Sequence, residues 1–134
     1  MIFFALLFIS VEMSNVYDDT MPYEILWSEQ FGTSDLDVIN TVTIDNAGNI
    51  IVAGNTKGSL DGDHAGNKDV FIRSYDTAGN MIWGEQLGTS DDDYINTVTI
   101  DNTGNIIVAG HTWGSLDGDN ADRFDAFIRA YTFA

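Results

Sequence analysis

The chain of 134 residues is long enough for one small domain and too short for two ordinary ones. Its 21 acidic and 5 basic residues give a formal net charge of −16, which argues against binding to nucleic acid or to an anionic membrane surface. Cysteine is absent from the sequence, so disulfide and thiolate chemistry are excluded. The acidity has two interpretations, which are solubility in water or a salty medium and the binding of cations.

The first segment, Met1 to Val11, is apolar. It is too short for a membrane span and has a suitable length for the apolar core of a signal peptide, although a positive leading region and a clear small-residue cleavage site are lacking. A polar, acidic connector runs from Glu12 to Tyr23. We assign residues 1–23 to a signal peptide and connector, which predicts an extracellular or cell-surface location. A mis-started or truncated reading frame is the alternative.

The rest of the chain is a tandem repeat. The segments Trp27 to Ala78 and Trp83 to Ala134 align at an offset of 56 residues, and about two-thirds of the aligned positions are identical. A repeat of this length indicates a repeat architecture, in which each copy is one supersecondary unit. We therefore divide the chain into a first repeat, 24–80, and a second repeat, 81–134.

The first repeat begins with a strand-like segment of bulky and aromatic residues, Ile25 to Phe31. The next segment, Asn40 to Asp45, alternates apolar and polar residues as a strand does. Residues 45–49 read Asp-Asn-Ala-Gly-Asn, which is typical of a hairpin turn in which glycine takes the position of positive φ. The segment Ile50 to Gly54 is apolar on both faces and predicts a strand covered on both sides.

The same chemistry continues to the end of the sequence. A strand is predicted from Asp69 to Tyr75, and a second turn of the same type follows at 76–80. A further strand is predicted from Met81 to Leu87. The second copy then supplies three more predicted strands, at Asn96 to Asp101, Ile106 to Gly110 and Asp125 to Tyr131.

These elements predict an all-β fold of two four-stranded antiparallel meanders, the unit that forms the blades of a β-propeller. If the hairpin strands are called A and B and the next two C and D, the eight predicted strands run D-A-B-C-D-A-B-C. Two blades cannot close a ring, because propellers have about four to eight blades. The chain therefore forms a homo-oligomer through its unpaired edge strands, is a fragment of a larger propeller, or remains a marginal pair of blades.

Several segments resemble the SBBP repeat, the β-propeller repeat of many bacterial surface and secreted proteins. The resemblance rests on QFGTSDLDVINTVTIDNAGNIIVAGNTKGSLDG and DVFIRSYDTAGN, and on their second copies QLGTSDDDYINTVTIDNTGNIIVAGHTWGSLDG and DAFIRAY. It covers about Ile25 to Tyr131 and implies a propeller fold. It implies no reaction and provides no catalytic or binding residues. The seven blades that the family name implies cannot be built from pairs of blades by simple symmetry, which favours a fragment.

Strand direction places the long loops at one end of each blade and the tight turns at the other. Twelve of the carboxylates fall on the long loops. The motif Ser-Leu-Asp-Gly-Asp occurs once in each copy and supplies two carboxylates two residues apart, as oxygen ligands for calcium require. The alternative is local turn chemistry, because no EF-hand glutamate follows. The candidate metal ligands are Asp61, Asp63, Asp69, Asp117, Asp119 and Asp125.

Other chemically interesting residues favour structural roles. His64 and His111 are not repeated, so we expect solvated loop histidines. We expect the tryptophans Trp27 and Trp83 to pack between blades, with Glu29 and Glu85 in solvent. Two arginines, Arg73 and Arg129, are expected to meet carboxylates across blades. Trp113 replaces Lys57 in a loop and would suit stacking on a sugar.

No nucleophile–base motif, zinc motif or phosphate-binding loop appears in the sequence, which favours a non-catalytic protein. The leading hypothesis is a secreted or surface propeller module that acts as a scaffold or binds protein or calcium through an acidic loop face. The alternative is a small lectin, by architectural analogy with two-blade fucose-binding lectins that assemble into closed propellers. A hydrolase or lyase fragment is disfavoured, because no catalytic constellation is present.

Overall fold

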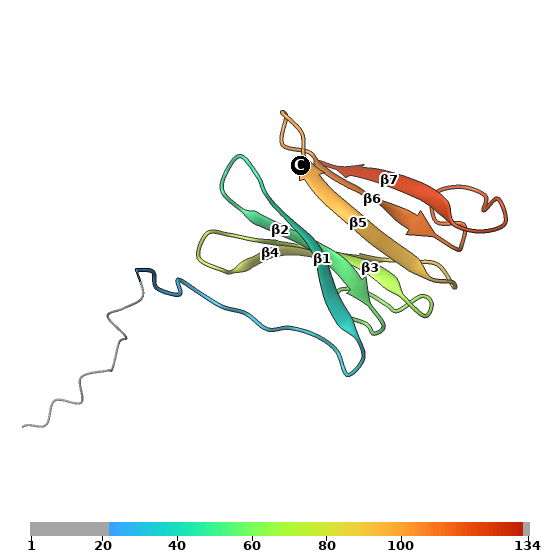
Figure 1. Cartoon of the computed structure of the whole chain (residues 1–134), viewed down its shortest axis with the longest axis horizontal. Coiled ribbons are helices and arrows are strands. Elements are labelled where there is room, and N and C mark those ends of the chain that lie inside the picture. Colours follow the sequence, from blue (N-terminus) through green and yellow to red (C-terminus); the bar gives the residue numbers. More distant parts are fainter. Residues whose placement is uncertain (1–21, 133–134) are drawn as a thin grey trace, which may run out of the picture.

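The computed structural model describes residues 22–132, and in them it consists of strands, turns and loops (Figure 1). The first sheet has the order β1-β2-β3-β4, and the second has the order β5-β6-β7. All strand pairs are antiparallel, so the first sheet is the predicted four-stranded meander and the second is a meander of three strands. Within residues 22–132 no helix is long and apolar enough to span a membrane. The strands are β1 (Asp37–Ile44), β2 (Ile50–Thr56), β3 (Asp69–Tyr75), β4 (Met81–Leu87), β5 (Asp93–Ile100), β6 (Ile106–Thr112) and β7 (Asp125–Tyr131).

The described residues form seven strands instead of the eight expected from the sequence, because the predicted strand at Ile25 to Phe31 does not form. Its copy in the second repeat does form a strand, β4, and pairs with β3. A strand of this type needs the free edge of a preceding blade, and no described strand offers that edge to residues 25–31. The observed order is therefore A-B-C-D followed by A-B-C. The prediction of a strand failed because it depends on a partner and not on local sequence.

The tight turns form as predicted. In the first hairpin the Asp45 carboxylate accepts hydrogen bonds from the backbone N–H groups of Ala47 and Asn49, at 2.8 and 2.9 Å. Gly48 adopts a φ of 87°, a conformation that glycine reaches without steric cost. Burial tends to raise the pKa of Asp45, but the hydrogen bonds from Asn49 and Ala47 outweigh it and lower the pKa. The turns at 76–80 and 101–105 repeat these contacts.

The two sheets pack face to face, with β5 lying against β1, β2 and β3 (Figure 1). One face of the first sheet contributes Ile51, Ala53, Val70, Ile72 and Leu87 to the core between the sheets. The second sheet contributes Ile95, Val98, Ile106, Val108 and Phe127. Because apolar area removed from water is the main source of stability, this inter-blade core holds the two repeats together. The prediction that the strand from Ile50 is covered on both sides is confirmed.

Equivalent positions of the two repeats differ sharply in exposure. Ile72 is 0% exposed in the core, whereas its copy Ile128 is 70% exposed on the outer face of the second sheet. In the opposite sense, Val98 is 5% exposed and its copy Val42 is 61% exposed. Each blade thus has one covered and one open apolar face, since only one pair of facing surfaces meets. The outer face of the first blade is partly covered by Phe31 of the irregular opening segment.

This asymmetry predicts different costs for the same substitution in the two repeats. Ile72→Ala should lower the free energy of unfolding by about 2–5 kcal/mol, because it leaves a cavity in the core. Ile128→Ala should change the free energy by less than about 0.5 kcal/mol in the monomer, because the side chain is already exposed. Urea denaturation at protein concentrations where the chain is monomeric measures both values. Equal costs would show that the second blade is covered on its outer face.

Candidate functional site

The meander gathers three long loops at one end of the molecule. These are the loops 57–68, 88–92 and 113–124, and we call this end, including the first residues of the strands they join, the long-loop end. The tight turns 45–49, 76–80 and 101–105 lie at the opposite end, as the sequence predicted. Long loops on a rigid scaffold are where binding residues usually occur, so the candidate site is sought here.

An aspartate at the start of the first strand of each sheet fastens the preceding loop. Asp37 accepts hydrogen bonds from the backbone N–H and the hydroxyl of Thr33, at 2.6 and 3.0 Å, and from the hydroxyl of Thr56 at 2.6 Å. Burial alone would raise the pKa of Asp37, but the hydrogen bonds from Thr56 and Thr33 lower it overall. Asp93 makes the equivalent contacts with Thr89 and Thr112. The two repeated aspartates therefore have a structural role.

A second aspartate in each repeat forms an ion pair with an arginine of the same repeat. Arg73 donates from Nε and Nη2 to the two carboxylate oxygens of Asp61, at 2.7 and 2.9 Å. These side chains are only 9% and 6% exposed, whereas those of Arg129 and Asp117 are 27% and 38% exposed. Burial tends to lower the pKa of Arg73, but the hydrogen bonds to Asp61 and Tyr75 raise it. The direct ion pairs form within each repeat and not across blades as expected, because the loop folds back onto its own sheet. Across the blades, the charge of Arg129 acts on Glu85 of the first sheet.

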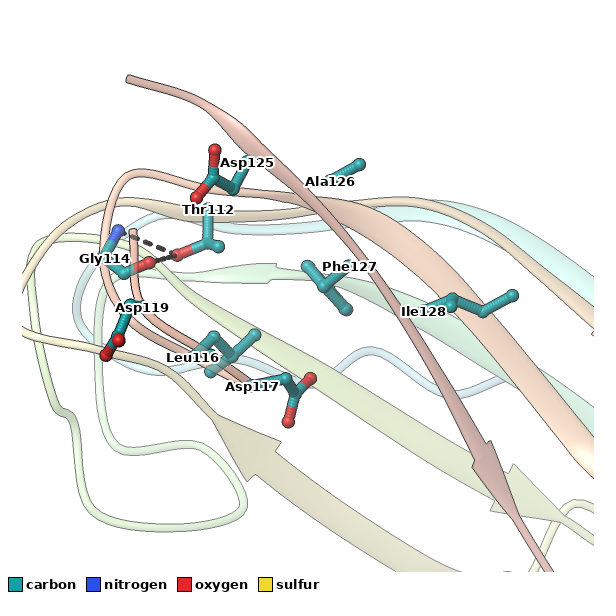
Figure 2. A pocket seen from close by; sticks show the side chains of 10 residues that line it. Thr112, Gly114, Leu116, Asp117, Asp119, Asp125, Ala126, Phe127 and Ile128 are labelled. Carbon is teal, nitrogen blue, oxygen red and sulfur yellow. Dashed lines mark hydrogen bonds between the residues drawn. The ribbon is translucent and has the colours of Figure 1, made fainter. Parts of the chain in front are cut away.

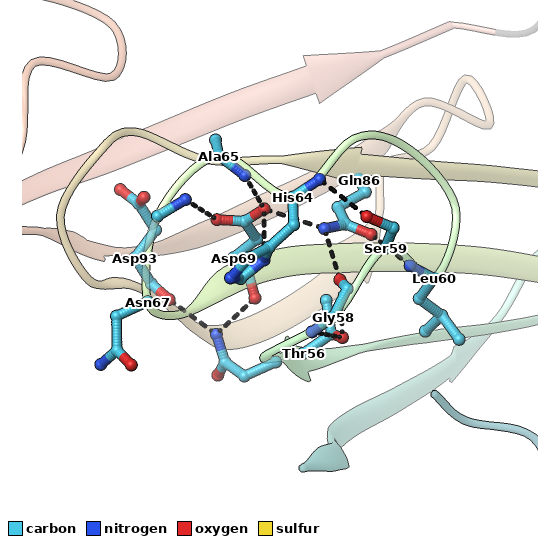
Figure 3. Close-up of polar contacts among 12 residues, drawn as sticks. Thr56, Gly58, Ser59, Leu60, His64, Ala65, Asn67, Asp69, Gln86 and Asp93 are labelled. Carbon is cyan, nitrogen blue, oxygen red and sulfur yellow. Dashed lines mark hydrogen bonds and ion pairs between the residues drawn. The ribbon is translucent and has the colours of Figure 1, made fainter. Parts of the chain in front are cut away.

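A third aspartate, Asp69, is fully buried beneath the loop 57–68 (Figure 3). It accepts hydrogen bonds from the backbone N–H of Ala65 and from Nε2 of Gln86, both at 2.8 Å. The Oε1 atom of Gln86 accepts from the backbone N–H groups of Leu60 and Asp61, at 2.8 and 3.1 Å. Gln86 thus ties the loop to β4. The sequence analysis missed Gln86. The only signal for it in the sequence was the Glu-Gln pair that occurs in both repeats.

The six predicted calcium ligands are not brought together as a metal site. Two of them pair with arginine, two accept backbone hydrogen bonds and two are exposed. They are, in that order, Asp61 and Asp117, Asp69 and Asp125, and Asp63 and Asp119. Among residues 22–132 no group of three or more His, Cys, Asp or Glu side chains is placed to hold a metal ion. Calcium binding therefore stays a prediction from the sequence.

The histidines occupy different environments from the expected solvated loops. His64 lies in the loop 57–68, with Nδ1 3.3 Å from the Asp69 carboxylate. His111 lies in β6 and stacks on Tyr94, with ring centroids 4.8 Å apart. Phe124 packs edge-on against His111, and Trp113 packs against Phe124 at 4.3 Å.

Four neighbouring positions of the second repeat have become aromatic or imidazole rings. They replace Val38, Asn55, Lys57 and Lys68 of the first repeat. We call the resulting group, Tyr94, His111, Trp113 and Phe124, the aromatic cluster. Trp113 and Phe124 are 44% and 52% exposed, so the cluster is accessible at the surface. The sequence analysis singled out only Trp113. The other three could have been found because all four positions change together.

An open pocket lies at the long-loop end where the loops of both blades meet. Its lining includes Asp63 and Asp91 from two loops and Trp113 and Asn120 from the third. Trp83 packs on Tyr131 of the second blade, with ring centroids 5.6 Å apart, which confirms its predicted place between blades. Burial raises the pKa of nearby Glu85, an effect that the charge of Arg129 partly offsets. Glu85 is thus half-buried, not in solvent as expected.

Two repeated antiparallel meanders that pack face to face define an all-β repeat protein, and the meander is the unit that forms β-propeller blades. The family model described as Beta-propeller repeat, SBBP, matches residues 26–61 and 82–117, which together make up more than half of the chain. The chain therefore belongs to the SBBP β-propeller repeat family, as the resemblance implied. No curated protein matches the chain in the comparison.

The two ion pairs of the long-loop end predict unequal effects of one substitution. Asp61→Asn should lower the free energy of unfolding by on the order of 3 kcal/mol, because it leaves the buried Arg73 without its charge partner. Asp117→Asn should cost no more than about 1 kcal/mol, because that pair is exposed. Chemical denaturation of both variants and of the parent chain measures the difference. A loss that is equal in the two variants would contradict the assignment of Asp61–Arg73 as the buried pair.

Proposed function

We propose that the chain is a non-catalytic β-propeller module of a secreted or surface protein and that it acts as a scaffold whose long-loop end binds a protein partner or cations. One observation carries the proposal. The polar groups that both repeats share at this end, Asp37 with Asp93 and the two Asp–Arg pairs, are engaged in contacts that shape the loops. The exposed carboxylates of this end that make none of these contacts are thus left for recognition.

The open pocket between the loops supports binding at this end. Asp63 and Asp91 line it and are exposed, and Asp119 is exposed on the third loop. With a chain charge of −16, this surface suits a partner segment rich in lysine or arginine. Attraction between exposed charges falls with ionic strength, so we expect binding to weaken in salt.

A charge-matched pair of variants tests the proposal with a fluorescent lysine-rich peptide as the probe. The triple variant D63N/D91N/D119N removes three charges from the long-loop end and should weaken binding at least about tenfold, or about 1.4 kcal/mol. The control D45N/D76N/D101N removes three charges from the opposite end. Asparagine is also favoured at those turn positions, so the fold should persist. Fluorescence anisotropy at low and high salt measures binding.

Equal weakening in both triple variants would show a non-specific effect of net charge, and absence of binding to the parent chain would overturn the proposed charged partner.

Calcium titration followed by thermal melting separates the cation from the protein partner. A rise in melting temperature at millimolar calcium would support cation binding, because a ligand of the folded state stabilises it. An unchanged melting temperature would remove calcium from the proposal.

Carbohydrate binding is the second candidate function, and the exposed aromatic cluster favours it. Trp113 is 44% exposed and lines the open pocket together with the polar residues Asn120 and Ser115, a combination that suits a sugar. A glycan array with the parent chain, Trp113→Ala and the control Lys57→Ala tests it. Binding that only Trp113→Ala abolishes would support a lectin, and an empty array would remove this candidate.

Secretion is the part of the proposal that rests on Met1 to Val11, which lie outside the described residues. N-terminal sequencing of the protein recovered outside the cell tests it. A mature end within residues 12–23 is expected, and retention of the whole chain inside the cell would contradict secretion.

A further inference from the structure

In the first blade, the fourth strand completes the long-loop end. β4 pairs with β3 in a register that places Gln86 opposite Phe71 and Glu85 opposite Ile72. From this position the Gln86 side chain reaches under the loop and contacts Gly58, Leu60, Asp61 and Asp69 (Figure 3). A single side chain thus satisfies two backbone N–H groups, a carbonyl and a buried carboxylate.

In the second blade, the equivalent place is an open pocket (Figure 2). Its lining includes the copies of all four residues that contact Gln86. No described strand pairs with the outer edge of β7, so the ladder groups of that edge are available. The pocket is therefore lined by the copies of the groups that hold Gln86 in the first blade. The four copies are Gly114, Leu116, Asp117 and Asp125.

The chain carries a second segment with the sequence that fits this place. Residues 26–32 read Leu-Trp-Ser-Glu-Gln-Phe-Gly, and residues 82–88, which include β4, read Ile-Trp-Gly-Glu-Gln-Leu-Gly. Gln30 is the copy of Gln86 and is exposed. Trp27 already stacks on Tyr75 at 6.2 Å, as Trp83 packs on Tyr131 at 5.6 Å. The segment is thus correctly placed toward the blade that follows it and lacks only a preceding strand to pair with.

The open faces of the two blades are the two halves of the interface that the chain already forms internally. On the second blade, the outer face carries the copies of four fully buried residues of the first blade. On the first blade, the open face carries Ile39, Val42 and Ile44, and the copies of these residues lie in or against the core. The outer-face residues of the second blade are Ile107, Ala109, Ala126 and Ile128.

We propose that the free edge of β7 binds residues 25–32 of a second copy of this chain as the fourth strand of the second blade, with Gln30 in the place that Gln86 takes in the first. The inference rests on the proposed function as a propeller module. The register of β3 and β4 then places Gln30 opposite Phe127 and Glu29 opposite Ile128. The contact is head-to-tail, so the copies form a ring if the rotation closes, with three chains giving six blades or four giving eight.

The proposed contact between copies differs from the contact inside the chain at Asp122, the copy of Gly66. At Gly66 an added Cβ would lie 2.3 and 2.5 Å from the carbonyl oxygens of Thr89 and Asp91 in the next blade. Its copy is Asp122, which has a φ of 110°. The loop 113–124 must therefore shift to admit the second copy. Asp122→Gly removes this obstacle and should tighten the association, whereas Gly66→Ala should destabilise the single chain.

Measurement of mass in solution by light scattering tests the assembly on the full chain. The parent chain should form a discrete trimer or tetramer. Gln30→Ala should weaken association at least about tenfold without changing the melting temperature of the dissociated chain, because Gln30 is exposed there. The matched variant Gln86→Ala should lower the melting temperature, because it leaves the Asp69 carboxylate short of a donor. A parent chain that stays monomeric up to millimolar concentration would overturn the proposal, as would aggregates that Gln30→Ala leaves unchanged.

A disulfide trap tests the register directly, since the natural chain has no cysteine. Glu29→Cys combined with Ile128→Cys places two exposed side chains opposite each other across the proposed contact, and oxidation should give covalent rings or ladders on a non-reducing gel. The control Glu29→Cys with Thr103→Cys places the second thiol at the opposite end and should cross-link far less. Equal cross-linking in the two pairs would overturn the register. A monomer that still binds the lysine-rich peptide would refute the assembly alone and leave the proposed module function standing.

Discussion

The structure depends on the burial of one apolar face of each blade against the other blade. The strands β2 and β6 are apolar on both sides, so each sheet needs a cover on both faces, and a single chain of two blades supplies only one contact between them. As a consequence, Ile72 is buried and Ile128 is exposed, although the two residues occupy equivalent positions in the two repeats. In a repeat architecture each unit is stabilised by its neighbours, so the open faces are those that have no neighbouring unit within residues 22–132.

The acidic composition has a related explanation in the long loops. Aspartates accept hydrogen bonds from loop N–H groups and threonine hydroxyls, and they pair with the few arginines. Arg73 also lies over the ring of Phe31 at 4.0 Å, so the ion pair with Asp61 anchors the opening segment as well as the loop. Much of the negative charge therefore serves the fold. Only the exposed carboxylates, such as Asp63 and Asp119, are left to face a partner.

Local sequence predicts those elements whose pairing partner lies nearby in the chain. The strands from Asp69, Met81 and Asp125 were predicted with their observed bounds, because alternation and turn residues define them. The first strand of each meander begins three residues earlier than predicted, because an aspartate at its start is held by a threonine of the next strand. For the candidate site, the sequence located the acidic end. It missed the Asp–Arg pairing within each repeat and the role of Gln86, because both depend on how a loop folds over its sheet.

The segment at residues 25–32 shows the limit of local sequence most clearly. It shares Trp-x-Glu-Gln with β4, and its tryptophan makes the same kind of contact, yet only β4 is a strand. The tryptophan packs on the following blade whether or not its segment is a strand. The strand itself forms only where its backbone can hydrogen-bond to the free edge of a preceding sheet.

The residues that differ between the repeats also bear on which surfaces can meet. Inside the chain, Lys68 donates to the Tyr94 hydroxyl at 3.2 Å and lies 4.7 Å from the centre of its ring. The equivalent residue of Lys68 in the second repeat is Phe124, and the equivalent residue of Tyr94 in the first repeat is Val38. A head-to-tail contact would therefore join two apolar side chains where the internal contact joins a cation and a phenol. If the first blade of one copy instead met the first blade of another copy, Lys68 would face Val38. The Lys68 ammonium group would then lack the Tyr94 hydroxyl that accepts its hydrogen bond. The side chains that meet are thus chemically matched both inside the chain and between copies. This matching favours a ring in which first and second blades alternate over contacts between two blades of the same kind.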